Sequence, residues 1–373
     1  MTHRTASASL RTLPASPLDP RPQPTGPAAA SGDAFHSSGQ SPGRTRTLHL
    51  LGPGQVGRAF LQQLADLPVR VVAISDARAT VFDRHGLPLD AIVAHKAAGG
   101  SLASWPRAES IPTALAVRII GAEVVVDATP TDAAGTAAAL QRARAALQNG
   151  AFLALCGKNA FAEAAPEWLL GTPRGRLGVH AVLGGAGQPL LRELDELREH
   201  ARAVVAVGNV TTTVLIDAIE RGASLEQGIE AAQARGLLEA DPTLDLDGSD
   251  AATKLRCVWG AVFGSPGQPA PTAEAIARDD IRALDVELVR ARARAGNTTR
   301  LVARGSRSGH DLRVAFEELP LGSPLAAPPD RVVYGYELPA GLRLHAGLAV
   351  GHERTAAALR ADVAAALGVE VRS

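Results

Sequence analysis

The chain has 373 residues, of which 46% are hydrophobic and 20% charged, and 38 basic side chains balance 38 acidic ones. This length allows two domains, and the balanced charge argues against nucleic acid or an anionic membrane surface as a partner. Every apolar stretch is interrupted by charge, Pro or Gly before it reaches membrane-spanning length. Cys156 and Cys257 lie far apart without a CxxC pattern, which indicates buried thiols rather than a zinc site or a disulfide.

Residues 1–46 differ in composition from the rest of the chain, because they are rich in Pro, Ser, Ala and Gly and lack apolar periodicity. Such a segment cannot bury enough surface to offset its ordering entropy, so we expect a disordered tail, or a start assigned too early. A transit peptide is the alternative, since the segment contains Arg and few acids. Its many prolines disfavour the amphipathic helix of such a peptide.

Order is expected from Thr47, where TLHLLGPGQVGRAFLQQLADL predicts a strand, a glycine turn and a helix. Strands alternating with helices predict a parallel sheet; the further strands are expected at 69–76, 122–130 and 151–158, with a helix at 132–148. Beyond about residue 165, short strands at 202–210, 300–306 and 311–319 mix with helices at 189–200 and 223–236. The fold class is therefore α/β. We expect a Rossmann-type parallel sheet domain over 47–164 and 340–373, closed by a helix near 353–367, and a second, α+β domain over 165–339.

Gly52, Gly54 and Gly57 form the pattern G-x-G-x-x-G between the first strand and its helix. In this context the first glycine allows the tight turn, the second lets the backbone approach a pyrophosphate, and the third lets helix and strand pack closely. The helix N-terminus then faces the phosphates. Dinucleotide contacts are expected from Gly52, Gly54, Gln55, Val56 and Gly57. A glycine turn without a ligand is the alternative.

Two further positions concern the cofactor. Asp76 ends the second strand, where an acid usually accepts hydrogen bonds from the adenosine ribose, whereas Arg78 could meet a 2′-phosphate instead. These two residues leave the choice between NAD and NADP open. Thr129 follows the strand at 122–130, at the sheet edge where ligands bind in open α/β folds. It either lies near the nicotinamide ribose or belongs to a simple turn.

The segment GLLEADPTLDLDGSDAATK (236–254) places several acids before one lysine: Glu239, Asp241, Asp245, Asp247, Asp250 and Lys254. A helix capped by Ser249 or Asp247 would put Asp250 and Lys254 on one face. The segment is interpreted either as an exposed helix after a calcium-like acidic loop or as a pocket whose carboxylates bind an ammonium group. Lys158, at the end of the strand 151–158, could converge with Lys254 across a cleft. A lysine beside another cation is expected to have a lowered pKa and to transfer protons.

The same segment resembles the homoserine dehydrogenase pattern G-Y-x-E-x-D-P-x-x-D-x-x-G-x-D-x-x-x-K, with Leu237 in place of the tyrosine. Other stretches similar to that family are GKNAFAE (157–163), HAVLGGAGQPLL (180–191) and GLAVGHERTAAALRAD (347–362). The resemblance covers residues 47 to about 370. It implies reversible, NAD(P)-dependent hydride transfer between L-homoserine and L-aspartate 4-semialdehyde, in cytoplasmic threonine and methionine biosynthesis, by a homodimer joined through the second domain.

The resemblance also implies roles for named residues. Lys254, Lys158 and Asp250 would be catalytic, and Lys158 would also contact the cofactor. The substrate would be bound by Glu239, Asp245, Asp250 and Thr211. Ala181 stands where the family has a glutamate of its metal-ion site, so no metal is expected. Val210 replaces a glycine next to the substrate, and Leu348, Ala349 and Val350 replace small residues near the nicotinamide.

Neither a kinase nor a regulatory ACT-type domain is expected. The replacements leave two other hypotheses open. One is a divergent NAD(P) oxidoreductase that acts on another amino-acid semialdehyde or alcohol. The other is a non-catalytic, cofactor-binding homologue, although such a protein would not need Lys158, Asp250 and Lys254 together.

Overall fold

The computed structural model describes residues 44–131, 135–173, 175–234, 243–268, 270–348 and 351–369. Most of the segment 1–46 therefore lies outside the described residues, as do Glu239, Asp241, Ala349 and Val350. In the described part of the chain, no helix is both long and apolar enough to span a bilayer.

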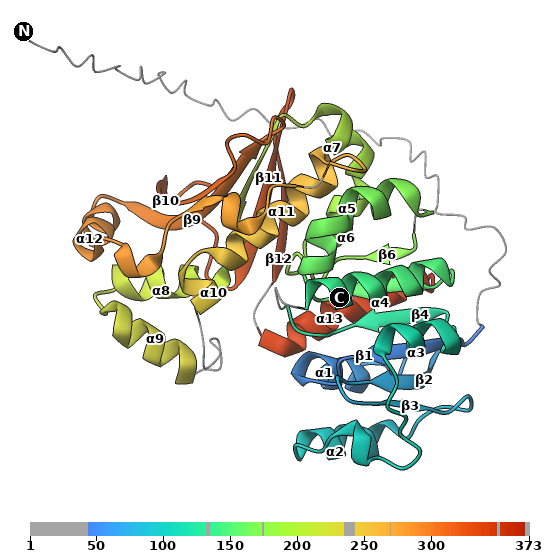
Figure 1. The fold of residues 1–373 in the computed structure, drawn as a ribbon. Helices are drawn as coiled ribbons and strands as arrows, with labels where there is room; N and C mark the ends of the chain where they lie inside the picture. Colours follow the sequence, from blue (N-terminus) through green and yellow to red (C-terminus); the bar gives the residue numbers. More distant parts are fainter. Residues whose placement is uncertain are drawn as a thin grey trace, which may run out of the picture. The chain divides into compact units, whose positions relative to one another are not determined.

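The first sheet is the predicted Rossmann-type sheet, with strand order β3-β2-β1-β4-β5-β6. β3 runs antiparallel to β2, and the other neighbours are parallel. Its strands are β1 (Arg46–Leu51), β2 (Val69–Ser75), β3 (Thr80–Phe82), β4 (Val124–Asp127), β5 (Phe152–Leu155) and β6 (Leu177–Gly178). The helices connecting them are α1 (Gln55–Gln62), α2 (Leu89–Ala97), α3 (Thr113–Ile120), α4 (Thr136–Gln148) and α5 (Asn159–Gly171), as Figure 1 shows. The alternating strands and helices of the sequence thus produced the expected fold.

The order in which the chain adds strands to this sheet reverses between β1 and β4, which are themselves parallel. From β1 the chain passes through α1 to β2 on one side and later enters β4 on the other. At this point Gly52 N–H donates to the Ser75 carbonyl (2.8 Å) and Ala128 N–H donates to the Leu51 carbonyl (2.8 Å). In open α/β sheets the ligand crevice lies outside the carboxyl ends of the strands at such a switch point.

The second sheet is mostly antiparallel, with order β12-β11-β7-β9-β10-β8; only the short pair β10 and β8 is parallel within the described strands. Its strands are β7 (Ala203–Val207), β8 (Ala277–Arg278), β9 (Asn297–Ser306), β10 (Arg313–Pro320), β11 (Arg331–Leu338) and β12 (Gly341–Leu348). The accompanying helices are α6 (Gly187–Arg192), α7 (Leu194–His200), α8 (Val210–Glu220), α9 (Leu225–Ala234), α10 (Thr243–Leu246), α11 (Ser249–Phe263) and α12 (Val286–Arg294). Single 3-10 turns occur at Leu102–Ser104, Ala273–Ala275 and Ile281–Ala283.

Helix α11 joins the two sheets. Its buried face, including Leu255 and Val258, shares one core with Val204 of β7 and Tyr334 of β11, and the same core includes Phe161 of α5. This double contact explains why α11 is buried along most of its length. It also places the residues at the start of α11 next to the carboxyl end of β5.

The last helix, α13 (Gly351–Ala366), returns to the first sheet as predicted. Its residues Leu359 and Val363 share a core with Leu48 and Phe60, and Figure 1 shows α13 beside α1 although they come from opposite ends of the described chain. The predicted boundary at residue 340 differs from the structure, because β12 pairs with β11 in the second sheet. Strand β6 pairs with β5 beyond the boundary predicted at residue 164.

Three local predictions are corrected by the structure. The strand expected at 202–210 ends at Val207, because Asn209 caps α8. The helix expected at 189–200 is interrupted at Glu193, which separates α6 from α7. Helix α11 is preceded by Gly248, whose φ of 77° lies in the left-handed region that favours glycine, so neither Ser249 nor Asp247 is its N-cap.

Candidate active site

The glycine turn after β1 has the geometry that its three positions predict. Gly52 has a φ of 85°, and a Cβ there would lie 2.8 Å from the Ala128 backbone. A Cβ on Gly57 would lie 2.2 Å from the Gly52 carbonyl oxygen, so only glycine lets α1 pack this close. Gly54 has no neighbour within 4 Å of such an atom, which leaves its backbone open to a ligand.

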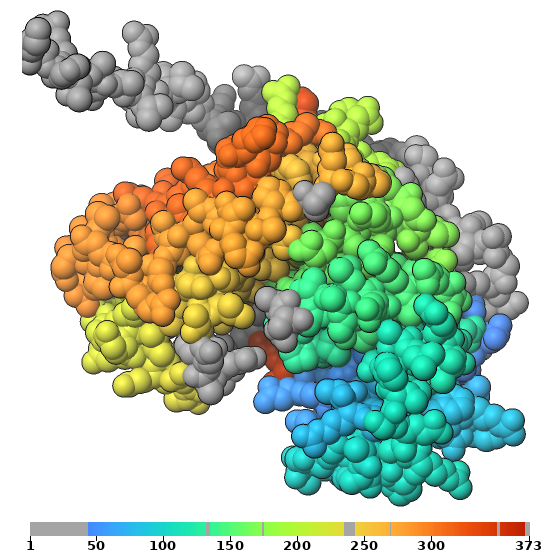
Figure 2. Space-filling view, viewed as in Figure 1, coloured from blue at the N-terminus to red at the C-terminus, as the bar shows by residue number. Residues whose placement is uncertain are grey.

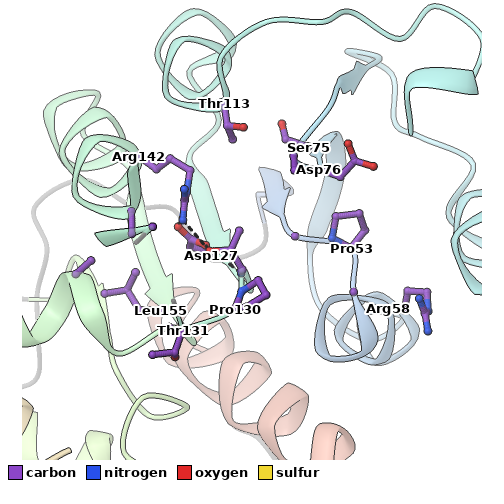
Figure 3. Close-up of a pocket in the computed structure, with 18 of the residues that line it drawn as sticks. Pro53, Arg58, Ser75, Asp76, Thr113, Asp127, Pro130, Thr131, Arg142 and Leu155 are labelled. Carbon is purple, nitrogen blue, oxygen red and sulfur yellow. Dashed lines mark hydrogen bonds and ion pairs between the residues drawn. The ribbon is translucent and has the colours of Figure 1, made fainter. Parts of the chain in front are cut away.

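A cavity of about 550 Å³ lies over this turn, between the carboxyl ends of β1, β2, β4 and β5 (Figure 3). Its lining includes Gly52, Gly54, Asp76, Thr129, Thr131 and Asn159. Gln55 and Val56 follow as the first residues of α1, whose first turn has no side-chain cap, so its N–H groups are available to an anion. The open Gly54 backbone, the uncapped helix and the cavity size fit a dinucleotide.

Asp76 is held by hydrogen bonds from the protein itself. Its Oδ1 accepts from the N–H groups of Arg78 (2.9 Å) and Ala79 (3.0 Å). Its Oδ2 accepts from Lys96 Nζ (2.9 Å) and from Leu102 N–H (3.0 Å). Burial alone would raise the pKa of Asp76, but these donors lower it to about 2. Since a carboxylate offers about four acceptor positions, little capacity remains for a ribose hydroxyl.

A second buried acid, Asp127, closes the other side of the cavity. Its Oδ2 accepts from Arg142 Nε of α4 (2.9 Å), while its Oδ1 accepts from the Thr129 hydroxyl (2.5 Å). Arg142 Nη2 also donates to the Thr129 oxygen (2.7 Å). Figure 3 shows the Arg142 side chain directed toward Asp127. The sequence analysis missed Arg142, because nothing in the pattern of a surface helix marks one arginine as the partner of a distant acid.

The acid–lysine residues predicted from two different segments meet at one carboxylate. Lys254 Nζ lies 2.8 Å from Asp250 Oδ2, and Lys158 Nζ lies 3.2 Å from Asp250 Oδ1. Lys254 Nζ also donates to the Gly208 carbonyl (2.6 Å). The Lys254 and Asp250 side chains are 13% and 15% exposed, so these charges are mostly shielded from water. The interpretation of 236–254 as an exposed helix does not fit this burial.

Asp245 on α10 and Asn209 before α8 extend this cluster. Asn209 Nδ2 donates to Asp245 Oδ1 (2.8 Å) and to Asp250 Oδ2 (3.0 Å). The Thr211 hydroxyl donates to Asp245 Oδ2 (3.3 Å). The structure thus brings together Lys158, Asp245, Asp250, Lys254 and Thr211. Asn209 was not predicted, although its place two residues after an apolar strand and directly before a Thr-rich helix marks an N-cap.

The pKa shifts in this cluster have identifiable causes. For Asp250 burial acts upward, but the two ammonium groups outweigh it and hold its pKa well below the usual value. Burial and the neighbouring Asp250 charge raise the pKa of Asp245. Burial would lower the pKa of Lys158, yet the ion pair with Asp250 raises it overall. The lowered lysine pKa expected from the sequence is therefore wrong for Lys158, because an anion faces it at close range.

The cavity and the cluster adjoin at the start of α5. Gly157, Asn159 and Thr131 line the cavity, and Lys158 between them donates its backbone N–H to Thr131 Oγ1 (3.2 Å). The Cys257 thiol of α11 in turn donates to the Lys158 carbonyl (3.6 Å). In Figure 2 the green surface of the α4–α5 region meets the gold surface of α11. The cavity lining thus comes within one residue of Lys158 along the chain.

Among the described residues, no group of three or more His, Cys, Asp or Glu side chains is placed to hold a metal ion. Ala181 lies in the turn before α6, and Val210 is the first residue of α8, directly after Asn209. Val210 therefore adjoins the cluster residue Asn209 in sequence. The effects of Val210 and Ala181 on substrate and metal binding stay predictions.

Comparison with known proteins finds homoserine dehydrogenases among the similar ones. A model of homoserine dehydrogenase matches residues 189–364, and a model of glutamate/leucine/phenylalanine/valine dehydrogenase matches residues 28–170. Homoserine dehydrogenase of Pyrococcus horikoshii is 26% identical over 232 residues, which cover 59% of this chain and 70% of the relative. That of Methanocaldococcus jannaschii is 24% identical over 236 residues, which cover 58% and 68%.

The chain is therefore similar to homoserine dehydrogenases and contains a domain that matches their family model. Solved structures of homoserine dehydrogenases share its fold. That of Thermoplasma acidophilum superposes with a TM-score of 0.66 at 21% identity and covers 87% of this chain and 99% of its own. A hyperthermophilic archaeal homoserine dehydrogenase in complex with NADPH gives a TM-score of 0.65 at 20% identity and covers 86% and 97%.

Proposed function

We propose that the protein is a homoserine dehydrogenase, which transfers hydride reversibly between L-homoserine and L-aspartate 4-semialdehyde with NAD(P). One observation carries this proposal. Asp250 pairs with the ammonium groups of Lys158 and Lys254, 3.2 and 2.8 Å away, and Lys158 stands in the chain between Gly157 and Asn159, which line the cavity that fits a dinucleotide. The pathway role in threonine and methionine biosynthesis and the cytoplasmic location belong to the same proposal. The similarity to homoserine dehydrogenases, and not the fold alone, favours this substrate over another amino-acid semialdehyde.

The cofactor's place is supported by the glycine turn and its surroundings. The pyrophosphate would be held by Gly52, Gly54, Gln55, Val56 and Gly57, and the nicotinamide end by Thr129 and Lys158. When bound, the nicotinamide supplies or accepts the hydride. The cavity would bring it close to the cluster, because Asn159 is the chain neighbour of Lys158 and Thr131 accepts a hydrogen bond from the Lys158 N–H, and both residues line the cavity.

The two lysines act on the hydroxyl or carbonyl oxygen of the substrate. Oxidation of an alcohol requires its O–H proton to leave, and positive charge stabilises the alkoxide that forms. Lys158 keeps its proton because Asp250 raises its pKa, so it acts as an electrostatic stabiliser. Lys254, anchored between Asp250 and the Gly208 carbonyl, passes the proton on, directly or through a water.

The amino group of the substrate is bound by the carboxylates. Asp245 is raised in pKa by burial and by the Asp250 charge, and within the described residues it makes no ion pair with a basic side chain. An ammonium group of the substrate would stabilise the ionised form of Asp245, because its positive charge offsets both the burial and the repulsion by Asp250. Thr211 orients Asp245 through its hydroxyl. By the resemblance to homoserine dehydrogenases, Glu239 would also bind this amino group.

A homodimer is part of the proposal and is supported by the outer face of the second sheet. Leu342, Leu344 and Leu348 alternate along β12 and are 43%, 38% and 38% exposed. They stand next to Val333 of β11, which packs with Val205 and Val302 on the same face. An apolar strand face of this kind is common where two subunits meet.

The direct test is an assay of the purified protein. Oxidation of NADH and of NADPH is followed by absorbance with aspartate 4-semialdehyde, and reduction of NAD⁺ and NADP⁺ with L-homoserine. We expect turnover in both directions with at least one cofactor. An absence of turnover with both cofactors in both directions would refute the proposed function, and turnover with a homologous semialdehyde alone would identify the divergent oxidoreductase instead.

A further inference from the structure

Asn209 lies where β7, α8, α10 and α11 converge. The residue is only 2% exposed. Its Oδ1 accepts from Thr212 N–H (2.8 Å), which makes it the N-cap of α8. The Thr212 hydroxyl donates to the same oxygen (3.2 Å). Because these contacts engage the oxygen, the amide nitrogen must point away from α8.

The amide nitrogen faces two acids from two different helices. Asn209 Nδ2 donates to Asp245 Oδ1 of α10 (2.8 Å) and to Asp250 Oδ2 of α11 (3.0 Å). An amide nitrogen carries two hydrogens, so one is available for each carboxylate. The Asp250 oxygen that receives one of them is also the oxygen that pairs with Lys254 Nζ at 2.8 Å.

A neutral donor is well suited to this place. Two carboxylates close together repel each other, and a lysine or arginine in place of Asn209 would neutralise the charge that a substrate ammonium group needs. An amide fixes the direction of both carboxylates without changing the net charge of the cluster. Its own direction is fixed in turn by the helix cap.

We infer that Asn209 is a positioning residue for the reaction, whose one amide nitrogen aligns Asp250 with Lys254 and Asp245 with the amino group of the substrate. This inference rests on the proposed function. A role confined to capping α8 is the competing explanation, since an N-cap alone stabilises a helix by roughly 1 kcal/mol.

Two substitutions separate these explanations. Asn209→Ser keeps a side-chain acceptor suitable for an N-cap but removes the two amide donors. Asn209→Asp keeps the shape and the cap but places a third carboxylate against the other two. Asp285, which caps α12 through Glu287 N–H (3.0 Å) and Leu288 N–H (3.1 Å), gives the matched control Asp285→Ser outside the site.

We expect Asn209→Ser to lower kcat/KM for homoserine about tenfold, the effect of one hydrogen bond to a charged group, with the KM for the cofactor within twofold. Its Tm should fall no more than that of Asp285→Ser. Asn209→Asp should be slower still at neutral pH, and the acidic limb of its pH–rate profile should move upward by about one unit. Wild-type kcat/KM and pH profile in both variants would overturn the inference.

A second measurement does not depend on turnover. Carboxyl ¹³C NMR of the full chain follows the titration of Asp250 and Asp245 in the wild type and in Asn209→Ser. Loss of the amide donor should raise the pKa of both carboxyl groups, and unchanged titration would overturn the inference. Because this result is obtained whether or not homoserine is oxidised, failure of the proposed function appears as an inactive wild type, and failure of the inference appears as unchanged variants.

Discussion

Lys158 Nζ lies 3.2 Å from Oδ1 of Asp250 and so joins the carboxyl end of β5 to the first turn of α11. The pair is mostly shielded from water, since the two side chains are 21% and 15% exposed. The second oxygen of the same carboxylate pairs with Lys254. Asp250 is therefore the common anchor of both cations, and its removal should affect both.

Asp250→Asn tests this anchor. The amide has nearly the shape of the carboxylate but no charge, so Lys158 and Lys254 would repel each other and lose their fixed positions. We expect kcat/KM for homoserine to fall by at least about a hundredfold, while circular dichroism shows a folded protein. Near-normal kcat/KM would show that the two lysines do not need this carboxylate.

Lys254→Ala removes the group assigned to the proton. We expect kcat to fall by roughly 10²–10⁴, the usual effect of losing a general acid or base, with little change in Tm. Arg221→Ala is a matched control, since Arg221 also pairs with an acid four residues before it, Asp217, but is 72% exposed. Unchanged kcat in Lys254→Ala would reject its role in proton transfer.

The surroundings of Asp76 predict how the cofactor is chosen. Its oxygens are already occupied and its charge is paired with Lys96, so it neither binds a ribose hydroxyl well nor repels a 2′-phosphate. Arg58 of α1 lines the same cavity and is labelled in Figure 3. We expect NADPH to be used at least as well as NADH.

Arg58→Ala should raise the KM for NADPH about tenfold, because a charge-assisted hydrogen bond to a phosphate is lost. The KM for NADH should stay within twofold. Arg84→Ala, on the exposed loop after β3, serves as the control. An equal effect of Arg58→Ala on both cofactors would show that Arg58 does not recognise the 2′-position.

Asp362 of α13 predicts a pH dependence of stability. It is buried and accepts from His180 N–H (2.8 Å) and Gln188 Nε2 (3.2 Å), and burial raises its pKa from 3.8 to about 7. The folded protein therefore holds a proton that the unfolded chain releases, so this group makes stability fall as pH rises from about 4 to about 7.

Asp362→Asn should remove that fall. We expect a higher Tm than the wild type at pH 8 and a smaller difference in Tm at pH 5, with a difference in unfolding free energy at pH 8 on the order of a few kcal/mol. Thermal unfolding followed by circular dichroism at both pH values checks this. A lower Tm of the variant at pH 8 would mean that the ionised carboxylate is needed there.

The exposed apolar face of β12 predicts that a charged residue introduced there will prevent dimerisation. Leu344→Lys should convert a dimer to a monomer in light scattering, because an ammonium group would be buried between subunits. Leu288→Lys, on α12 and 45% exposed, should leave the mass unchanged. A wild-type protein that is monomeric at all concentrations, or a Leu344→Lys dimer, would exclude this face as the interface.

The sequence by itself determined the features that depend on residues close together in the chain. The positive φ of Gly52 and the close approach of Gly57 to the Gly52 carbonyl are steric limits that act within six residues. The contact between Asp250 and Lys254 follows from the period of one helix, which brings residues four apart onto one face. The alternating apolar strands and helices likewise predicted the first sheet, because each unit has its own periodicity.

The tertiary structure alone decided which distant side chains meet. The pairs of Lys158 with Asp250, Arg142 with Asp127 and Lys96 with Asp76 each join separate elements, and no local pattern specifies such a partner. The β11–β12 hairpin was not predicted, because whether so short a segment forms a strand depends on the strands it pairs with in the second sheet. Asn209 shows the same limit: its cap could be expected from the sequence, but the two acids that its amide nitrogen binds were selected by the packing of α10 and α11 around it.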